Sequence, residues 1–328
     1  MDYIGYSVYN RTFLGERFDL DSLNVTAEEP DGIISQMMAA ADLMADKVAT
    51  VAKRPLGATI HLCNIGEYLL DQFIADAWIE TRKKKEFKHP FRPGYHINFD
   101  KGNLPLAPGF PATFKKAMAD CAKLDIDACV MHAPMVETSD TDGDWIDLML
   151  RDDIVDAMRG NKTILCWENA QDTPARYRLL KNLLGWRERL VAQLERAGCA
   201  DLASRHVFCF DTGHFNLSLQ RDGASKDEVT RYLPEFGKLV KVFHIQINDG
   251  TRDHHLLPFI GPATYLRNAS KKDVDDKKLK KNSALVLKYL WTCDDNKQLD
   301  DRHVHIEIDG PFTIDEVVSF YARYYSRS

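Results

Sequence analysis

The segment CFDTGHFNLS, residues 209–218, places two good metal ligands directly after an apolar run. Asp211 closes the run HVFCF, and His214 follows three residues later. Asp and Gly also end strands and favour tight turns, so this pair alone is equally consistent with a strand stop and a cap for the next helix. The choice between a turn and a pair of ligands therefore depends on the rest of the chain.

Seven further His, Asp and Glu residues lie in or after other short apolar runs. They are His96, His132, Glu168, His244, Asp253, His255 and Glu307. A charged residue that sits inside or closes an apolar run is hard to explain by packing, because such side chains are rarely buried without a partner. This argument is strongest for four of the nine candidates, namely Glu168, Asp211, His244 and Glu307.

The remaining candidates also have plain structural explanations. His96 could be a satisfied core histidine, and His132, which precedes Ala-Pro, could simply end a strand. Asp253 and His255 could be solvated loop residues. His61 is similar to His96 and is left out of the predicted site.

Imidazole and carboxylate groups gathered in one place predict a metal centre. Burying several carboxylates together is costly unless cations neutralise them. The mixture of nitrogen and oxygen ligands suits Zn²⁺, Mn²⁺, Co²⁺ or Fe²⁺ better than Ca²⁺ or Mg²⁺ alone. A bound divalent ion can polarise a substrate oxygen or lower the pKa of water, so the pattern predicts a metal-dependent enzyme.

Eight short apolar runs predict strands, and helical patterns lie between them. The runs span 3–8, 58–63, 94–99, 127–132, 162–168, 206–211, 241–247 and 303–308. Clear helical patterns cover 33–52, 111–124, 174–198 and 313–325, with Gly198 and Thr313 as predicted caps. This alternation predicts an α/β fold with a parallel sheet, and eight repeats predict a closed (β/α)₈ TIM barrel. An open doubly wound sheet is the alternative, but no GxGxxG follows the first strand.

The barrel would bring the candidate residues together. No linker rich in Gly, Pro or Ser divides the chain, so we expect residues 1–328 to form one domain with long loops on its C-terminal face. In such a barrel the C-terminal strand ends meet at one rim, where active sites lie. The charged stretch 271–281 follows the seventh strand and is expected in a loop there. The sequence leaves open whether the loops at 10–30 and 262–281 close over the site or form the interface of a homo-oligomer.

The composition narrows the class of protein. A net charge of −6 gives no global attraction to nucleic acid or to an anionic membrane, although a local basic patch would still be compatible with it. No apolar run is long enough to cross a bilayer, and the first ten residues lack the pattern of a signal peptide. The seven scattered cysteines form no CxxC pair, which predicts buried, reduced thiols in a cytoplasmic protein.

At these residues the sequence resembles the xylose-isomerase-like TIM-barrel superfamily. The group includes sugar isomerases and epimerases and the endonuclease IV type of abasic-site endonuclease, AP endonuclease family 2. CFDTGHFN is similar to the segment after strand 6 of these proteins, and HIQINDGTRDHHLLP to their strand-7 segment. The resemblance extends strand by strand over nearly the whole chain.

The resemblance implies two functions. In the isomerases one divalent ion is held by residues matching Glu168, Asp211, His244 and Glu307, and the two glutamates exchange a proton with the sugar. We expect this reaction, isomerisation or epimerisation of a sugar or sugar phosphate with one Mn²⁺, Co²⁺ or Zn²⁺, because the acidic chain suits a small substrate. A lyase or dehydratase using the same proton abstraction would have the same pattern.

The alternative is an endonuclease IV-like enzyme that cleaves DNA at abasic sites. The resemblance then implies a trinuclear zinc site, in which five further ligands match His96, His132, His214, Asp253 and His255. All nine residue types follow in the right strand order, which favours this alternative. The lack of an evident basic, aromatic-interleaved surface counts against it. A barrel that merely binds a ligand is disfavoured, because every acid/base and metal residue type is present.

Overall fold

The computed structural model describes most of the chain. The described residues are 1–9, 30–63, 72–97, 101–135, 138–170, 175–221, 225–253, 255–259, 275–308 and 312–327. The predicted loops at 10–30 and 262–281 lie largely outside these ranges. All nine candidate site residues lie within them.

Eight parallel strands close into a barrel in sequence order, which confirms the predicted (β/α)₈ TIM barrel. Each strand pairs with the next, and the last pairs with the first. The strands are β1 (Tyr3–Tyr9), β2 (Gly57–Cys63), β3 (Gly94–His96), β4 (Ala128–His132), β5 (Ile164–Glu168), β6 (His206–Asp211), β7 (Val240–Ile245) and β8 (His303–Ile306). All eight predicted runs are therefore strands, with ends that differ by up to three residues.

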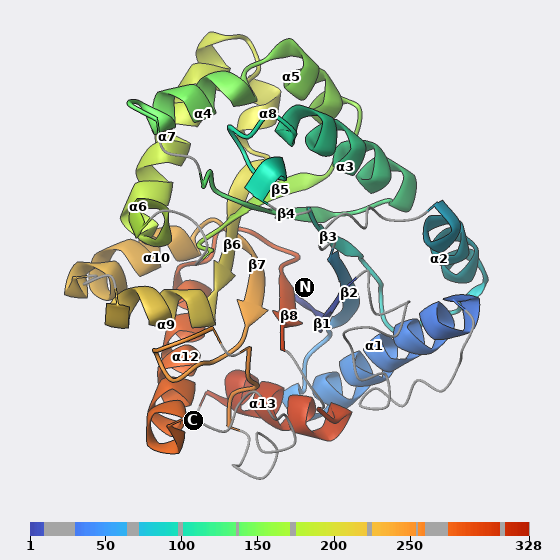
Figure 1. Cartoon of the computed structure of the whole chain (residues 1–328). Coiled ribbons are helices and arrows are strands. Elements are labelled where there is room, and N and C mark those ends of the chain that lie inside the picture. The colour runs from blue at the N-terminus through green and yellow to red at the C-terminus, as the bar shows by residue number, and fades with distance from the viewer. Residues whose placement is uncertain are drawn as a thin grey trace.

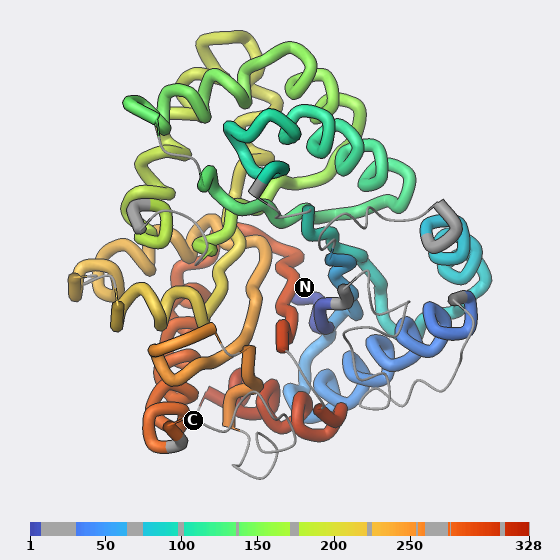
Figure 2. Tube along the Cα trace, in the orientation of Figure 1, coloured from blue at the N-terminus to red at the C-terminus, as the bar shows by residue number. Residues whose placement is uncertain are grey.

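Helices form a ring around the strands (Figures 1 and 2). They are α1 (Pro30–Ala52), α2 (Gln72–Lys84), α3 (Phe110–Leu124), α4 (Thr141–Met149), α5 (Asp152–Arg159), α6 (Ala175–Arg178), α7 (Leu180–Arg196), α8 (Ala200–Ala203), α9 (Thr212–Arg221), α10 (Leu233–Gly237), α12 (Asp276–Asn296) and α13 (Ile314–Ser326), with short helical turns η3 (Lys101–Asn103) and η4 (Glu228–Tyr232). The predicted caps are confirmed: Gly198 has φ +74° just after α7, and Thr313 forms a capping box with Glu316. No described helix combines the length and apolar composition needed to cross a membrane.

Two predictions about the helical segments were wrong. The single helix expected over 174–198 is broken at Leu179, which is extended. The break lets the buried Glu228 carboxylate accept a hydrogen bond from the backbone N–H of Leu180 at 2.7 Å, which satisfies a donor in the first turn of α7. Residues 276–281, expected in a loop, begin α12, because the Asp275 side chain caps the N–H groups of Lys277 and Lys278.

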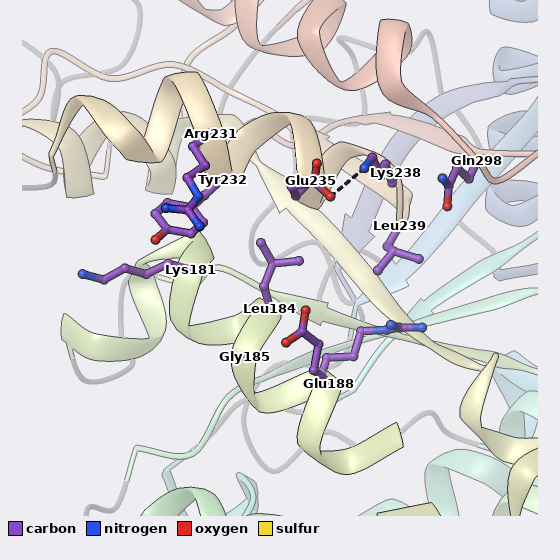
Figure 3. A pocket seen from close by; sticks show the side chains of 11 residues that line it. Lys181, Leu184, Gly185, Glu188, Arg231, Tyr232, Glu235, Lys238, Leu239 and Gln298 are labelled. Atoms are coloured by element: carbon purple, nitrogen blue, oxygen red, sulfur yellow. Dashed lines mark hydrogen bonds and ion pairs between the residues drawn. The ribbon is translucent and has the colours of Figure 1, made fainter. Parts of the chain in front are cut away.

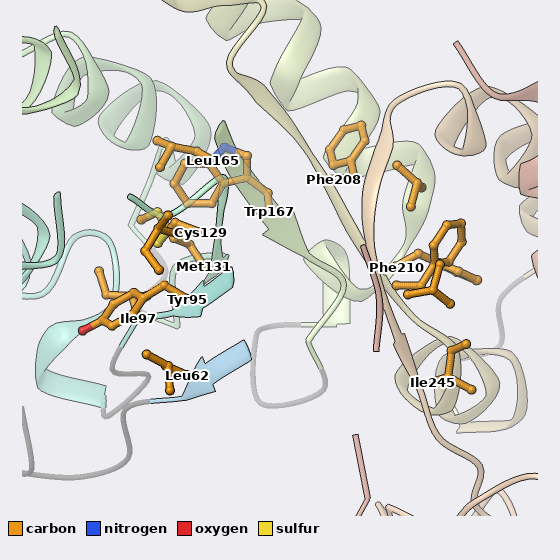
Figure 4. Packing of buried hydrophobic residues seen from close by; sticks show 14 of the residues in the cluster. Leu62, Tyr95, Ile97, Cys129, Met131, Leu165, Trp167, Phe208, Phe210 and Ile245 are labelled. Carbon is orange, nitrogen blue, oxygen red and sulfur yellow. The ribbon is translucent and has the colours of Figure 1, made fainter. Parts of the chain in front are cut away.

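Alternate strand residues face opposite sides of the barrel wall. The outward-facing residues pack against the helices and include Leu62, Tyr95, Met131, Trp167, Phe208, Phe210 and Ile245 (Figure 4). The inward-facing residues between them form a separate cluster of small side chains, Ala128, Val130, Cys166, Val207, Cys209 and Val242. All seven cysteines are buried and free, as predicted. This period of two decides which strand residues can reach the barrel axis.

The end of the barrel opposite the candidate rim is held by charged groups. Asp127, directly before β4, lies 2.8 Å from Nε2 of His303 and 3.0 Å from Nζ of Lys241. Burial opposes ionisation of Asp127, yet these two partners hold its pKa well below the ordinary range. Its carboxylate therefore links β4 to β7 and β8 at neutral pH.

We predict that Asp127→Ala lowers the free energy of unfolding by about 3 kcal/mol, because it leaves the buried Lys241 ammonium without its carboxylate. Because the pKa of Asp127 is depressed in the folded state, this stabilisation is present at neutral pH and is lost as the pH falls below the ordinary Asp range. Denaturant unfolding at pH 7 measures it. Asp76→Ala, which removes an exposed pair with Lys123, is the control and should cost at most about 0.5 kcal/mol. Equal effects of the two substitutions would contradict this role.

Candidate metal centre

The structure brings all nine predicted residues to the C-terminal rim. Five of them end a strand or directly follow one, in the inward-facing phase, and these are His96, His132, Glu168, Asp211 and Glu307. His244 is the next-to-last residue of β7 and has the same phase. The strand register places His132 beside Glu168, and Asp211 beside His244. His214 lies in the first turn of α9, while Asp253 and His255 lie in the segment after β7.

Glu168 is the centre of this arrangement. Its Oε2 lies 3.2 Å from Nε2 of His96 and 3.3 Å from Nε2 of His132. Its Oε1 lies 3.2 Å from Nδ1 of His214 and 3.5 Å from Nδ1 of His244. Glu168 is buried, and each of its two carboxylate oxygens lies near a different pair of imidazoles. One side chain can therefore serve neighbouring ions.

Three groups of side chains at the rim could each hold a metal ion, because one donor atom from every member lies within 4.8 Å of the others. They are His96–Glu168–His244, Glu168–Asp211–His244–Glu307 and His214–Asp253–His255. The first two share Glu168 and His244. His132 joins the first through its contact with Glu168. The rim thus carries adjoining donor groups rather than one.

In the segment CFDTGHFNLS the end of β6 is both a turn and a pair of possible metal ligands. The Asp211 carboxylate accepts the backbone N–H of His214 at 2.6 Å and so caps the first turn of α9. In this first turn Nδ1 of His214 lies 3.2 Å from Oε1 of Glu168. A Cβ at Gly213 would lie 2.4 Å from the Gln246 side chain, so the glycine is required by close packing.

Two side chains that hold Asp211 were not predicted. Gln246 donates through Nε2 to the Asp211 carboxylate at 3.2 and 3.3 Å. Asn169 exchanges two hydrogen bonds with the backbone of Asp211, at 2.8 and 3.0 Å. Both are buried amides next to predicted site residues, and this adjacency in HIQIN and WENAQ was the available signal.

The segment after β7 is folded back so that its donors face the rim. Ile247 and Leu256 form an antiparallel bridge, with backbone hydrogen bonds of 2.7 and 3.0 Å. Within this turn Oδ2 of Asp253 lies 2.9 Å from Nε2 of His214 and 2.8 Å from Nε2 of His255. The carboxylate of Asp253 thereby joins this segment to α9.

Comparisons with known proteins bear on the fold. No protein-family model matches the sequence, and no curated protein is significantly similar to it. Among solved structures, a D-tagatose 3-epimerase-like protein matches with a TM-score of 0.54 and 14% identity over 99% of this chain and 97% of that one. Endonuclease IV from Thermus thermophilus gives 0.52 and 14%, over 99% and 100%. A xylose isomerase domain containing protein from Salmonella typhimurium gives 0.51 and 10%, over 99% and 95%.

The chain shares the TIM-barrel fold of these structures. At these identities the likeness shows the fold alone, and it is the fold that the resemblance in the sequence implied. The solved structures with this fold include a D-tagatose 3-epimerase-like protein and an endonuclease IV. The choice between their chemistries therefore rests on the rim residues themselves.

The pKa values of the rim groups reflect buried carboxylates and imidazoles that lie side by side. Burial favours neutral carboxyl groups, and with the charges of Glu168 and Glu307 it raises the pKa of Asp211 to about 6. Burial likewise opposes ionisation of Glu307, but His244 lowers its pKa to about 2. Burial alone would lower the pKa of His244 and of His214. The pKa of His244 is nevertheless raised well above the ordinary value by Cys209 and by Glu307 and Glu168. That of His214 is likewise raised well above the ordinary value by Asp211 and Asp253.

The donor atoms fit divalent ions. Nδ1 of His214 and Nδ1 of His244 form no hydrogen bond with any described residue, although carboxylate oxygens lie 3.2 and 2.6 Å away. Oδ1 of Asp253 is similarly without a described hydrogen-bond partner. Buried polar atoms are nearly always satisfied, and an ion shared by these atoms would give each of them a partner. The mixed nitrogen and oxygen set suits zinc and related metals.

A cavity of about 500 Å³ lies elsewhere, among residues of α7, η4 and α10 (Figure 3). It is lined mainly by long polar side chains, and Glu235 and Lys238 form an ion pair across 2.6 Å within it. None of the possible metal-holding groups among the described residues includes a residue of its lining. The metal ligands predicted from the sequence lie at the barrel rim instead.

We predict that zinc binding releases protons and becomes tighter as the pH rises. In the metal-free protein the raised pKa values of His214 and His244 keep these imidazoles protonated near neutral pH. A nitrogen must lose its proton before it can bind an ion. Calorimetric zinc titrations in two buffers of different ionisation enthalpy would show a release of about one to two protons per chain. Heats that do not depend on the buffer would contradict the assignment.

Proposed function

We propose that this chain is a metal-dependent phosphodiesterase of the endonuclease IV type that cleaves DNA at abasic sites. The observation that carries the proposal is the third donor group, His214–Asp253–His255, which lies beside the groups built on Glu168. A sugar isomerase that uses one ion would need only Glu168, Asp211, His244 and Glu307. The additional donors favour the endonuclease IV-like enzyme, which was the alternative expectation from the sequence.

The charge of the site supports this substrate class. The rim carries four carboxylates, those of Glu168, Asp211, Asp253 and Glu307. Counting only the carboxylates and the ions, one divalent ion would leave two negative charges, which suits a neutral sugar and repels a phosphodiester. Three divalent ions would leave two positive charges, which attract the phosphate and the charge that develops on it.

The roles of the side chains follow from their contacts. The two oxygens of Glu168 face different imidazoles, so this residue would bridge neighbouring ions. Asp253 would join the third group through His214 and His255. Gln246 and Asn169 hold Asp211 in place. Ions bound in these groups would supply Lewis-acid catalysis, by polarising a phosphoryl oxygen and making water a better nucleophile.

We predict that the purified chain loaded with zinc cleaves a duplex oligonucleotide at a single abasic site. Glu168→Gln should reduce the rate at least about 1000-fold, or about 4 kcal/mol in activation free energy, because it removes the bridging carboxylate. A gel assay of a labelled strand measures both. Glu188→Gln, at an exposed glutamate of α7, is the matched control and should leave the rate unchanged. An uncleaved abasic duplex with zinc fully bound would contradict the proposal.

A second candidate is the sugar isomerase or epimerase. The observation in its favour is that Glu168 and Glu307 both lie beside His244, with Nδ1 at 3.5 and 2.6 Å from their oxygens. Two carboxylates around one ion could exchange a proton with a bound sugar. Deuterium uptake by sugars or sugar phosphates in D₂O tests this candidate.

Removal of the third donor group separates the two candidates. We predict that Asp253→Asn lowers the zinc content from about three ions per chain to about two and slows abasic-site cleavage at least about 100-fold. Elemental mass spectrometry and the gel assay measure these changes. Asp249→Asn, in the same segment after β7, is the control. A content near one ion in both variants and the unmodified chain, with proton exchange on a sugar, would favour the isomerase instead.

A further inference from the structure

A second set of histidines lies inside the barrel, below the candidate metal centre. His61 of β2 and His303 and His305 of β8 are all fully buried. The rings of His61 and His305 lie 3.7 Å apart between centroids. Nδ1 of His61 lies 3.4 Å from Nε2 of His244. His61 therefore contacts a predicted metal ligand from the side away from the rim.

The contacts of His244 decide which of its two nitrogens could bind an ion. Nδ1 is the nitrogen that faces Glu307 and Glu168, at 2.6 and 3.5 Å. If Nδ1 binds an ion it must carry a lone pair, so a neutral His244 has its proton on Nε2. This N–H points toward Nδ1 of His61. His61 must then accept it and carry its own proton on Nε2.

We propose that His61 is a positioning residue for His244: Nδ1 of His61 accepts the Nε2–H of His244 and so holds the ring and the tautomer in which Nδ1 binds metal. The inference rests on the metal centre of the proposed function. Metal-ligating histidines nearly always donate their second N–H to a carboxylate, a carbonyl or water. Here a buried imidazole takes that place. Cys209 also interacts with His244, but a thiol is a weak acceptor.

The His61 ring is held by the barrel wall. The register places His61 opposite Ser7 on β1 and opposite Gly94 on β3. A Cβ at position 94 would lie 1.6 Å from Cδ2 and 1.7 Å from Nε2 of His61. The glycine therefore leaves the space that this edge of the imidazole fills, while His305 packs on its face. Fixed on two sides, the ring keeps Nδ1 directed at His244.

The same proton count argues against a further metal ion among the buried histidines. His61, His303 and His305 could offer donor atoms within 4.8 Å of one another. However, the nitrogens of His303 already contact Thr59 at 3.2 Å and Asp127 at 2.8 Å. A neutral His61 that accepts from His244 has no second lone pair to give. The cluster therefore supports the rim rather than forming a site of its own.

Three substitutions of His61 test the proposal through the affinity for Zn²⁺ alone, measured on the full chain by competition with a chelator. His61→Leu should weaken at least one bound zinc by about 10- to 100-fold, because the acceptor is lost. His61→Asn, whose Oδ1 can occupy the place of Nδ1, should stay within about threefold of the unmodified chain. His61→Gln, whose polar atoms reach the Nε2 position instead, should behave like His61→Leu.

The matched control is His206→Leu. His206 is also fully buried in a strand, and its Nδ1 lies 3.2 Å from Nε1 of Trp167, but it belongs to none of the possible metal-holding groups among the described residues. Its substitution should leave zinc affinity unchanged. If His61 only filled space, the apolar leucine would preserve affinity at least as well as asparagine, and the predicted order would be reversed.

The outcomes separate this inference from the proposed function. Unaltered zinc affinity in His61→Leu, or equal affinities in His61→Asn and His61→Gln if the leucine variant does not fold, would overturn the positioning role and leave the proposed function standing. Zinc binding that follows the predicted order, without cleavage of abasic DNA, would support the positioning role and overturn the function. An unmodified chain that binds no zinc would overturn both.

Discussion

Four carboxylates meet at one end of the barrel, and their burial is the constraint on which the rest of the site depends. Such groups are destabilising together unless positive charge lies among them. In the metal-free protein the surrounding histidines supply it, since the raised pKa values of His214 and His244 keep these rings protonated. Those protons occupy the nitrogens that an ion would need. An ion that binds at these nitrogens therefore replaces the protons, so that one positive charge is exchanged for another.

The barrel makes this concentration of charge feasible by dividing each strand between two environments. Outward residues such as Trp167 and Phe243 pack in the apolar layer under the helices. Each directly precedes a predicted ligand, Glu168 or His244, in the sequence. Inward residues such as Cys166 and Val242 are small and fill the axis below the rim. The apolar layer supplies the burial energy that holds the strands in register. The rim can then carry groups that would not be stable in a core.

The extent to which the sequence predicted this site follows from the same division. Glu168 and Asp211 were identifiable because they close apolar runs, and the period of two carries them to the axis once the strand is known. His61 has the same phase but sits in the middle of β2, so its sequence context is that of an ordinary core histidine. Its contact with His244 crosses 183 positions. Only the closed barrel brings these two strands within reach of each other's side chains.

The break at Leu179 was missed for a similar reason. It depends on the Glu228 carboxylate, which lies 48 positions after Leu180 and which local helix propensity does not include.

The choice between the two candidate chemistries depended on which side chains lie close together rather than on which residue types are present. Asp253 and His255 resemble loop residues in the sequence, and the bridge between Ile247 and Leu256 is what turns them toward His214. That turn adds a carboxylate and an imidazole to a set that one ion would already satisfy. Further ions would balance the added negative charge, and their surplus positive charge is what an anionic phosphodiester requires and a neutral sugar does not.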